Sequence, residues 1–197
     1  MLEVSTGPIV DFREGRELKR KTLELFTVPY LFPEHFNLKN KTITWPKYPV
    51  NKANYIIIDD SIKNKLRENG NYVLVKRFSS KEEKRRINAA IWLGDLSEDK
   101  LVGFDNKVNY FHSNKKGLEL DLSKGLGLYL NSTIVDEYFR QISGNTQVNV
   151  SDLRNLKYPS KDVLSFIGSQ WIIGEDMSQK KIDYLVDSQI FKKGNAQ

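Results

Sequence analysis

The spacing of apolar residues changes near residue 118, and this change constrains the fold more than any other feature of the sequence. Across residues 122–142 apolar side chains recur every four positions, which is the spacing of amphipathic helices. Polar residues at 131–133 can cap helix ends, so the pattern predicts two helices with a break between them. Another apolar stripe predicts a last helix over residues 178–191.

The earlier apolar segments are short and rich in β-branched and aromatic residues, which is typical of strands. A period of two over residues 85–93 predicts a strand that returns antiparallel to residues 71–78. Residues 60–69 are expected to form a short helix. The predicted fold is α+β, with a twisted, mostly antiparallel sheet in the N-terminal part and helices packed on it toward the C-terminus. The other predicted strands cover residues 27–32, 42–46, 53–59 and 108–113.

Composition excludes several kinds of function. The chain has no cysteine, which excludes disulfides, thiol catalysis and cysteine-based zinc sites, and which is typical of cytoplasmic proteins. No apolar run approaches the roughly 20 residues that span a bilayer, so no membrane partner is expected. With 31 basic and 25 acidic residues, the net charge of +6 is compatible with a nucleic-acid partner.

No residue of the sequence is assigned to catalysis. Phosphate-binding loops of the Walker type are missing, and the Gly-Leu-Gly run at 125–127 lies inside a helical pattern with no strand before it. Asp59 and Asp60 could bind a metal, but their place between a strand and a helix favours Asp60 or Ser61 as a helix N-cap. The sequence shows no nucleophile beside a base.

Residues 76–86, here called the basic loop, follow a predicted strand and carry six Lys or Arg residues against two acids. A capping pattern at Ser80 and Glu83 predicts a helix start, where exposed N–H groups can seat a phosphate. The alternative is a solvated turn with local ion pairs. The predicted phosphate clamp consists of Lys76, Arg77, Ser79, Ser80, Lys81, Lys84, Arg85 and Arg86.

Residues 145–149, here called the amide segment, alternate amide side chains along an extended stretch, so that they would point one way. Amides can bind adenine at N6 and N7 in the major groove of DNA. The alternative is an ordinary polar loop. The residues predicted to lie near bases are Arg140, Asn145, Thr146, Gln147 and Asn149.

Four stretches occur in one order: "TGPIVDFR", "TVPYLFPEHF" with "WPK", "GNYVLVKRFSSKEEKRR" and "GLGLYLNSTIVDEYFRQISGNTQVNVSDLRNLKYP". Together they resemble the C-terminal target-recognition region of adenine-specific DNA methyltransferases from bacterial restriction–modification systems. The resemblance covers nearly the whole chain and is weakest after about Leu164. It implies a DNA target-recognition domain over residues 1–160 and a helical segment over residues 161–197 packed on it.

The resemblance also implies what the chain lacks. Such methyltransferases have an upstream catalytic domain that binds S-adenosylmethionine and holds adenine with an Asn-Pro-Pro-Tyr motif, and this sequence contains no Pro-Pro pair. We therefore expect a domain taken from a longer protein, with no cofactor of its own. The implied partners are double-stranded DNA and the catalytic domain in cis. Two alternatives remain: an assembly module that docks an acidic protein, and a small nuclease, which would need a cluster of acids.

Overall fold

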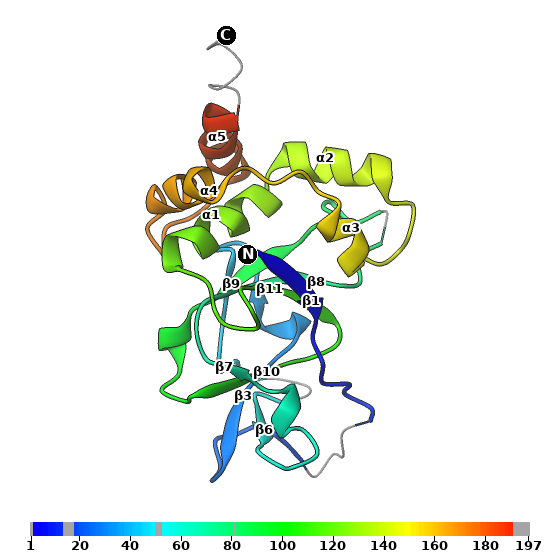
Figure 1. The fold of residues 1–197 in the computed structure, drawn as a ribbon, viewed down its shortest axis with the longest axis vertical. Helices are drawn as coiled ribbons and strands as arrows, with labels where there is room; N and C mark the ends of the chain where they lie inside the picture. Colours follow the sequence, from blue (N-terminus) through cyan, green and yellow to red (C-terminus); the bar gives the residue numbers. More distant parts are fainter. Residues whose placement is uncertain (1, 14–17, 50–52, 81, 191–197) are drawn as a thin grey trace.

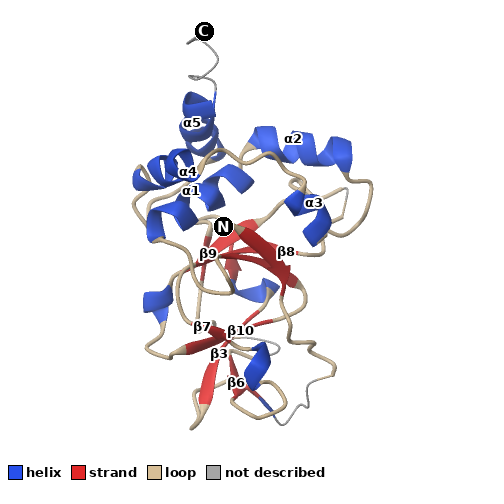
Figure 2. Ribbon diagram, viewed as in Figure 1, coloured by secondary structure: helices blue, strands red, loops and turns tan. Residues whose placement is uncertain are grey.

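The structure, a computed structural model, describes residues 2–13, 18–49, 53–80 and 82–190, and its fold is α+β as predicted (Figures 1 and 2). The strands are β1 (Glu3–Thr6), β2 (Lys19–Arg20), β3 (Thr27–Leu31), β4 (Phe36–Asn37), β5 (Thr42–Ile43), β6 (Tyr55–Ile57), β7 (Arg67–Glu68), β8 (Tyr72–Lys76), β9 (Ala89–Trp92), β10 (Leu101–Phe104) and β11 (Val108–His112). The helices are α1 (Leu120–Leu130), α2 (Thr133–Ile142), α3 (Val150–Arg154), α4 (Lys161–Ser169) and α5 (Gln179–Ile190), with short 3-10 turns η2 (Pro33–His35), η3 (Lys63–Lys65) and η4 (Gly94–Leu96).

The strands form two sheets, a division that the sequence did not indicate. One has six strands in the order β1-β11-β8-β9-β5-β4, and the other has five in the order β2-β6-β3-β10-β7. The predicted return strand is confirmed, because β9 pairs antiparallel with β8 and Val73 lies opposite Ile91. In Figure 1 the helices lie on one side of the six-stranded sheet, and the five-stranded sheet lies at the opposite end of the molecule.

The six-stranded sheet is buried on both faces. Along β8, Val73 and Val75 belong to the core shared with the helices, whereas Tyr72 and Leu74 belong to an aromatic core on the other face. This alternation follows from the two-residue period of a strand. The sheet is therefore a rigid base for the segments that leave its strand ends.

Two glycines let α1 and α4 approach each other closely. A Cβ atom on Gly125 would lie 1.7 Å from the carbonyl oxygen of Leu164, and one on Gly168 would lie 1.8 Å from that of Asp121. The Gly-Leu-Gly run therefore serves helix packing. Helix α4 lies in the helical segment that the resemblance implies for residues 161–197, but no apolar periodicity predicted this helix itself.

The predicted break between two helices is confirmed at Asn131, which ends α1, and Ser132, which precedes α2. Asn131 is fully buried, and its amide binds the backbone of Ala89 in both directions, accepting from N–H at 3.3 Å and donating to the carbonyl at 3.0 Å. The side chain thus joins the helix break to strand β9.

Two helical predictions were wrong. Residues 60–69 form the turn η3 followed by β7, so neither Asp60 nor Ser61 caps a helix as predicted. The Asp59 carboxylate instead accepts a hydrogen bond from the N–H of Ser61 at 2.8 Å. No helix begins at Ser80, where the described residues form turns and bends. The capping contact nevertheless exists, because the Glu83 carboxylate accepts from the N–H of Ser80 at 3.1 Å.

Candidate nucleic-acid interface

The basic loop and the amide segment lie side by side, although about 70 residues separate them in the sequence (residues 77 and 147). Phe78 and Gln147 form an antiparallel bridge. The N–H of Ser79 donates to the carbonyl of Thr146 at 3.2 Å, and the N–H of Val148 donates to that of Arg77 at 2.7 Å. The structure therefore places the cations of one segment next to the amides of the other.

Helix α2 holds the basic loop in place through Asp136 and Arg140. One Asp136 oxygen accepts hydrogen bonds from the N–H groups of Arg86 and Ile87 at 2.7 and 3.3 Å, and the other accepts from the Arg140 guanidinium at 2.8 Å. Arg140 also donates to the carbonyl of Glu83 at 2.8 Å. Burial alone would raise the pKa of Asp136, but these hydrogen bonds outweigh burial and lower it. Arg140 thus positions the loop.

Arg86 and Ser79 were predicted to contact phosphate, and their burial contradicts this. Their exposed fractions are 1% and 2%. The Arg86 guanidinium donates to the Ser79 hydroxyl at 3.1 Å and to the Asn145 carbonyl, and it lies over the Phe139 ring at 5.5 Å. The Arg86 charge is therefore engaged by groups within the protein, and these contacts join the basic loop to the amide segment.

The other cations of the basic loop are more accessible. Lys84 is exposed, and Lys76 is half-buried with its ammonium over the Phe36 ring. Arg77 donates to the carbonyl of Asn106 at 3.1 Å and to the Gln147 side chain at 3.4 Å.

Arg85 is half-buried and donates to the carbonyl of Ser132 at 2.5 Å. Ser80 has its N–H occupied by Glu83, so the predicted seat at a helix start is not formed. Lys81, also predicted in the clamp, lies outside the described residues.

The amide segment divides into outward and inward side chains. Asn145 and Thr146 are exposed, and Gln147 is half-buried beside Arg77. Asn149 instead caps α3 in a capping box with Asp152, so its amide serves the helix start. The side chains that face outward are therefore those of residues 145–147.

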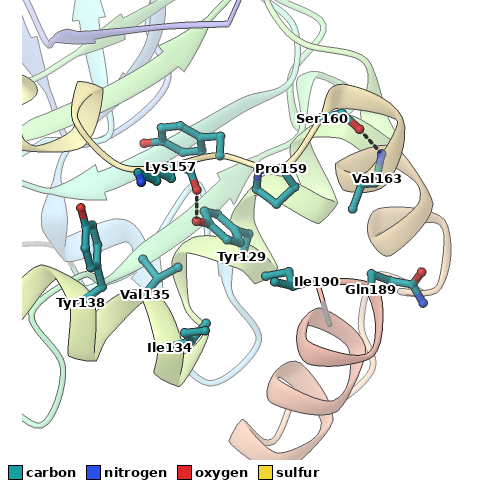
Figure 3. Close-up of a pocket in the computed structure, with 11 residues that line it drawn as sticks. Tyr129, Ile134, Val135, Tyr138, Lys157, Pro159, Ser160, Val163, Gln189 and Ile190 are labelled. Atoms are coloured by element: carbon teal, nitrogen blue, oxygen red, sulfur yellow. Dashed lines mark hydrogen bonds between the residues drawn. The ribbon is translucent and has the colours of Figure 1, made fainter. Parts of the chain in front are cut away.

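Two hollows flank this region. The first, here called the basic hollow, has a volume of about 600 Å³, and its lining includes Lys41, Lys84 and Arg85. Sequence reasoning missed Lys41, because it is 44 residues before Arg85 and stands in no charge run. The second, here called the apolar hollow, has a volume of about 430 Å³ and lies between α1, α2, the start of α4 and the end of α5, with Tyr129, Tyr138 and Pro159 among its lining residues (Figure 3). Its lining suits apolar contact more than phosphate.

Within the described ranges, no group of three or more His, Asp or Glu side chains is placed to hold a metal ion. None of the described helices is long and apolar enough to cross a membrane.

No family model matches the chain. The chain is 44% identical to the Type II methyltransferase M.PstI of Providencia stuartii over 189 residues, which is 96% of this chain and 36% of that protein. It is also 44% identical to the Type II methyltransferase M.BsuBI of Bacillus subtilis, over 99% of this chain and 38% of that protein. The chain therefore spans less than two fifths of the length of these relatives, and it is similar to part of a Type II methyltransferase.

Proposed function

We propose that this chain recognises double-stranded DNA as the target-recognition part of an adenine-specific DNA methyltransferase in a restriction–modification system. The similarity to Type II methyltransferases supports this assignment. The observation that supports it is the bridge between Phe78 and Gln147, because it puts the cations of the basic loop and the polar side chains of the amide segment on adjacent segments. Contacts to phosphates fix register on the duplex, and contacts to base edges select the sequence.

The side chains divide into three roles. The accessible cations Lys76, Arg77, Lys84 and Arg85 bind backbone phosphates. The amide segment, through Asn145, Thr146 and Gln147, lies near the bases, where an amide can pair with adenine. Arg86, Arg140 and Asn149 hold these two segments in position.

Methyl transfer is assigned to a catalytic domain outside this chain. S-adenosylmethionine supplies the methyl group there when bound, and that domain takes the target adenine out of the helix. Residues 125–127 do not fit this cofactor, because Gly125 contacts α4 and a Cβ atom on Gly127 would lie 3.1 Å from Ile91. This chain contributes binding and orientation of the duplex.

Titration of the chain with duplex DNA at several salt concentrations tests the proposal. Each phosphate contact contributes about −0.9 to the slope of log affinity against log salt. Replacing both Lys76 and Lys84 with alanine should flatten the slope by about 1.8 while sequence preference remains. Lys63→Ala is the matched control, because Lys63 is exposed on η3 at the other end of the molecule. If the double variant has the slope of the control, the phosphate assignment is wrong.

A second candidate function is assembly with a protein partner, and the apolar hollow favours it. Its rim includes the exposed side chains of Ile134 and Tyr138, which would be available to an apolar partner (Figure 3). In that case duplex titration shows no sequence preference, and alanine at Asn145 and Gln147 has no effect on it. A loss of sequence preference in that variant, with folding retained, would exclude assembly as the main function.

A further inference from the structure

The basic hollow gathers charge from distant parts of the chain. Its walls come from the turn between β4 and β5, the basic loop, the start of α2 and the segment before α5. Its lining residues are Leu38, Lys39, Lys41, Glu83, Lys84, Arg85, Asn88, Thr133, Asp176, Met177, Ser178 and Gln179. Four of them are cations and two are acids.

Lys41 is a cation whose side chain is largely buried. Its exposed fraction is 9%, and its side chain has neither a hydrogen bond nor an ion pair with any described residue. Its backbone is fixed at φ 57°, and its carbonyl accepts from the N–H of Ile91 at 2.9 Å. Burial lowers the pKa of the Lys41 ammonium, and the charges of Arg85 and Lys84 lower it further.

Arg85 has an unused donor in the same region. Its Nε atom is buried and has no hydrogen-bond partner among the described residues, although buried donors in native proteins are nearly always paired. Asp136 and Asp183 act on its charge from nearby. Their oxygens already accept hydrogen bonds from Arg140 and Thr133, among other donors.

The two acids of the basic hollow also have partners of their own. Glu83 accepts from the N–H of Ser80 at 3.1 Å, and Asp176 lies 4.0 Å from the ammonium of Lys39. Four cations against two acids leave a net positive charge in the lining of the basic hollow, and an anion with several acceptor oxygens would balance it.

We propose that the basic hollow is a seat for one phosphate group of the DNA backbone, held by Lys41, Lys84 and Arg85. This inference rests on the proposed function for the source of the phosphate, and a free phosphate ion has the same chemistry. It adds to the predicted clamp Lys41, a residue far from the basic loop in sequence.

Lys41→Met tests the seat, with Lys39→Met as the matched control, because Lys39 lines the same hollow but its side chain is 75% exposed. In duplex titrations monitored by fluorescence anisotropy, Lys41→Met should weaken binding about tenfold or more. It should also flatten the salt slope by about 0.9, with a smaller effect from Lys39→Met. If both variants bind the duplex as the unchanged protein does, the seat is wrong while the proposed function stands.

Thermal unfolding separates a phosphate seat from a structural lysine. Without ligand, Lys41→Met should melt at a temperature no lower than that of the unchanged protein, because the Lys41 side chain makes neither a hydrogen bond nor an ion pair with a described residue. Inorganic phosphate should raise the melting temperature of the unchanged protein and of Lys39→Met more than that of Lys41→Met. A lower melting temperature for Lys41→Met together with an equal phosphate effect would overturn the seat. Stabilisation by phosphate without any duplex binding would support the seat and refute the proposed function.

Discussion

Replacing Arg86 with alanine decides whether this side chain builds the interface or binds DNA. The substitution removes a hydrogen bond to the Ser79 hydroxyl, one to the Asn145 carbonyl and the contact over the Phe139 ring. Hydrogen bonds from a charged donor contribute about 1.5–3 kcal/mol each, and a cation over a ring adds about 0.5–2 kcal/mol. Removing a desolvated charge offsets part of this loss. We therefore expect Arg86→Ala to lower the free energy of unfolding by about 3–5 kcal/mol.

The assay is urea denaturation followed by circular dichroism, with Lys84→Ala as the control. Lys84 is an exposed cation of the same loop, and its removal should change the free energy of unfolding by less than about 0.5 kcal/mol. In a thermal melt the Arg86 variant should unfold about 10 °C lower. If Arg86→Ala is as stable as Lys84→Ala and flattens the salt slope of duplex binding, its guanidinium contacts DNA and the burial argument is refuted.

Three further predictions concern stability. Asn131→Ala should cost about 2–4 kcal/mol in chemical denaturation, because it leaves the buried backbone groups of Ala89 without this partner. Gly125→Ala should cost about 2–3 kcal/mol because α1 and α4 must separate, whereas Gly144→Ala, with nothing within 4 Å of the added carbon, should be nearly neutral. The lowered pKa of Asp136 contributes stability that is present above its unfolded pKa of about 4 and is lost as pH falls through the lower folded value, so Asp136→Asn should flatten the acid limb of a stability–pH curve.

The secondary structure could be predicted where apolar residues with a regular spacing all pack against one extended buried surface. The alternation through Ile87, Ala89 and Ile91 marked β9, because all three side chains enter the core shared with the helices. Prediction from periodicity failed where apolar side chains are buried by a turn and not by a regular helix. Ile62 and Leu66 have helical spacing, yet they lie immediately before and after the 3-10 turn η3. Both side chains are buried in the core of the five-stranded sheet.

Helix α4 was missed for a related reason. Its contact with α1 depends on the absence of side chains at Gly168 and Gly125, and neither glycine adds to an apolar stripe. Close packing through glycine is visible only when both helices are placed. A sequence pattern that counts large apolar side chains therefore misses such a pair.

The candidate site could be located from the sequence but not resolved into roles. A charge run predicts cations in one place, whereas burial depends on partners that lie far away in sequence, and Asn145 is 59 residues beyond Arg86. Lys84 and Arg86 therefore look alike in the sequence, although one is exposed and the other is buried. A block substitution of residues 84–86 would weaken folding and binding together, and its loss of DNA affinity would say nothing about contact. Each position therefore needs a single variant, with a stability measurement beside each titration. Arg86 holds the amide segment in place, whereas the exposed cations are proposed to orient that segment on the duplex.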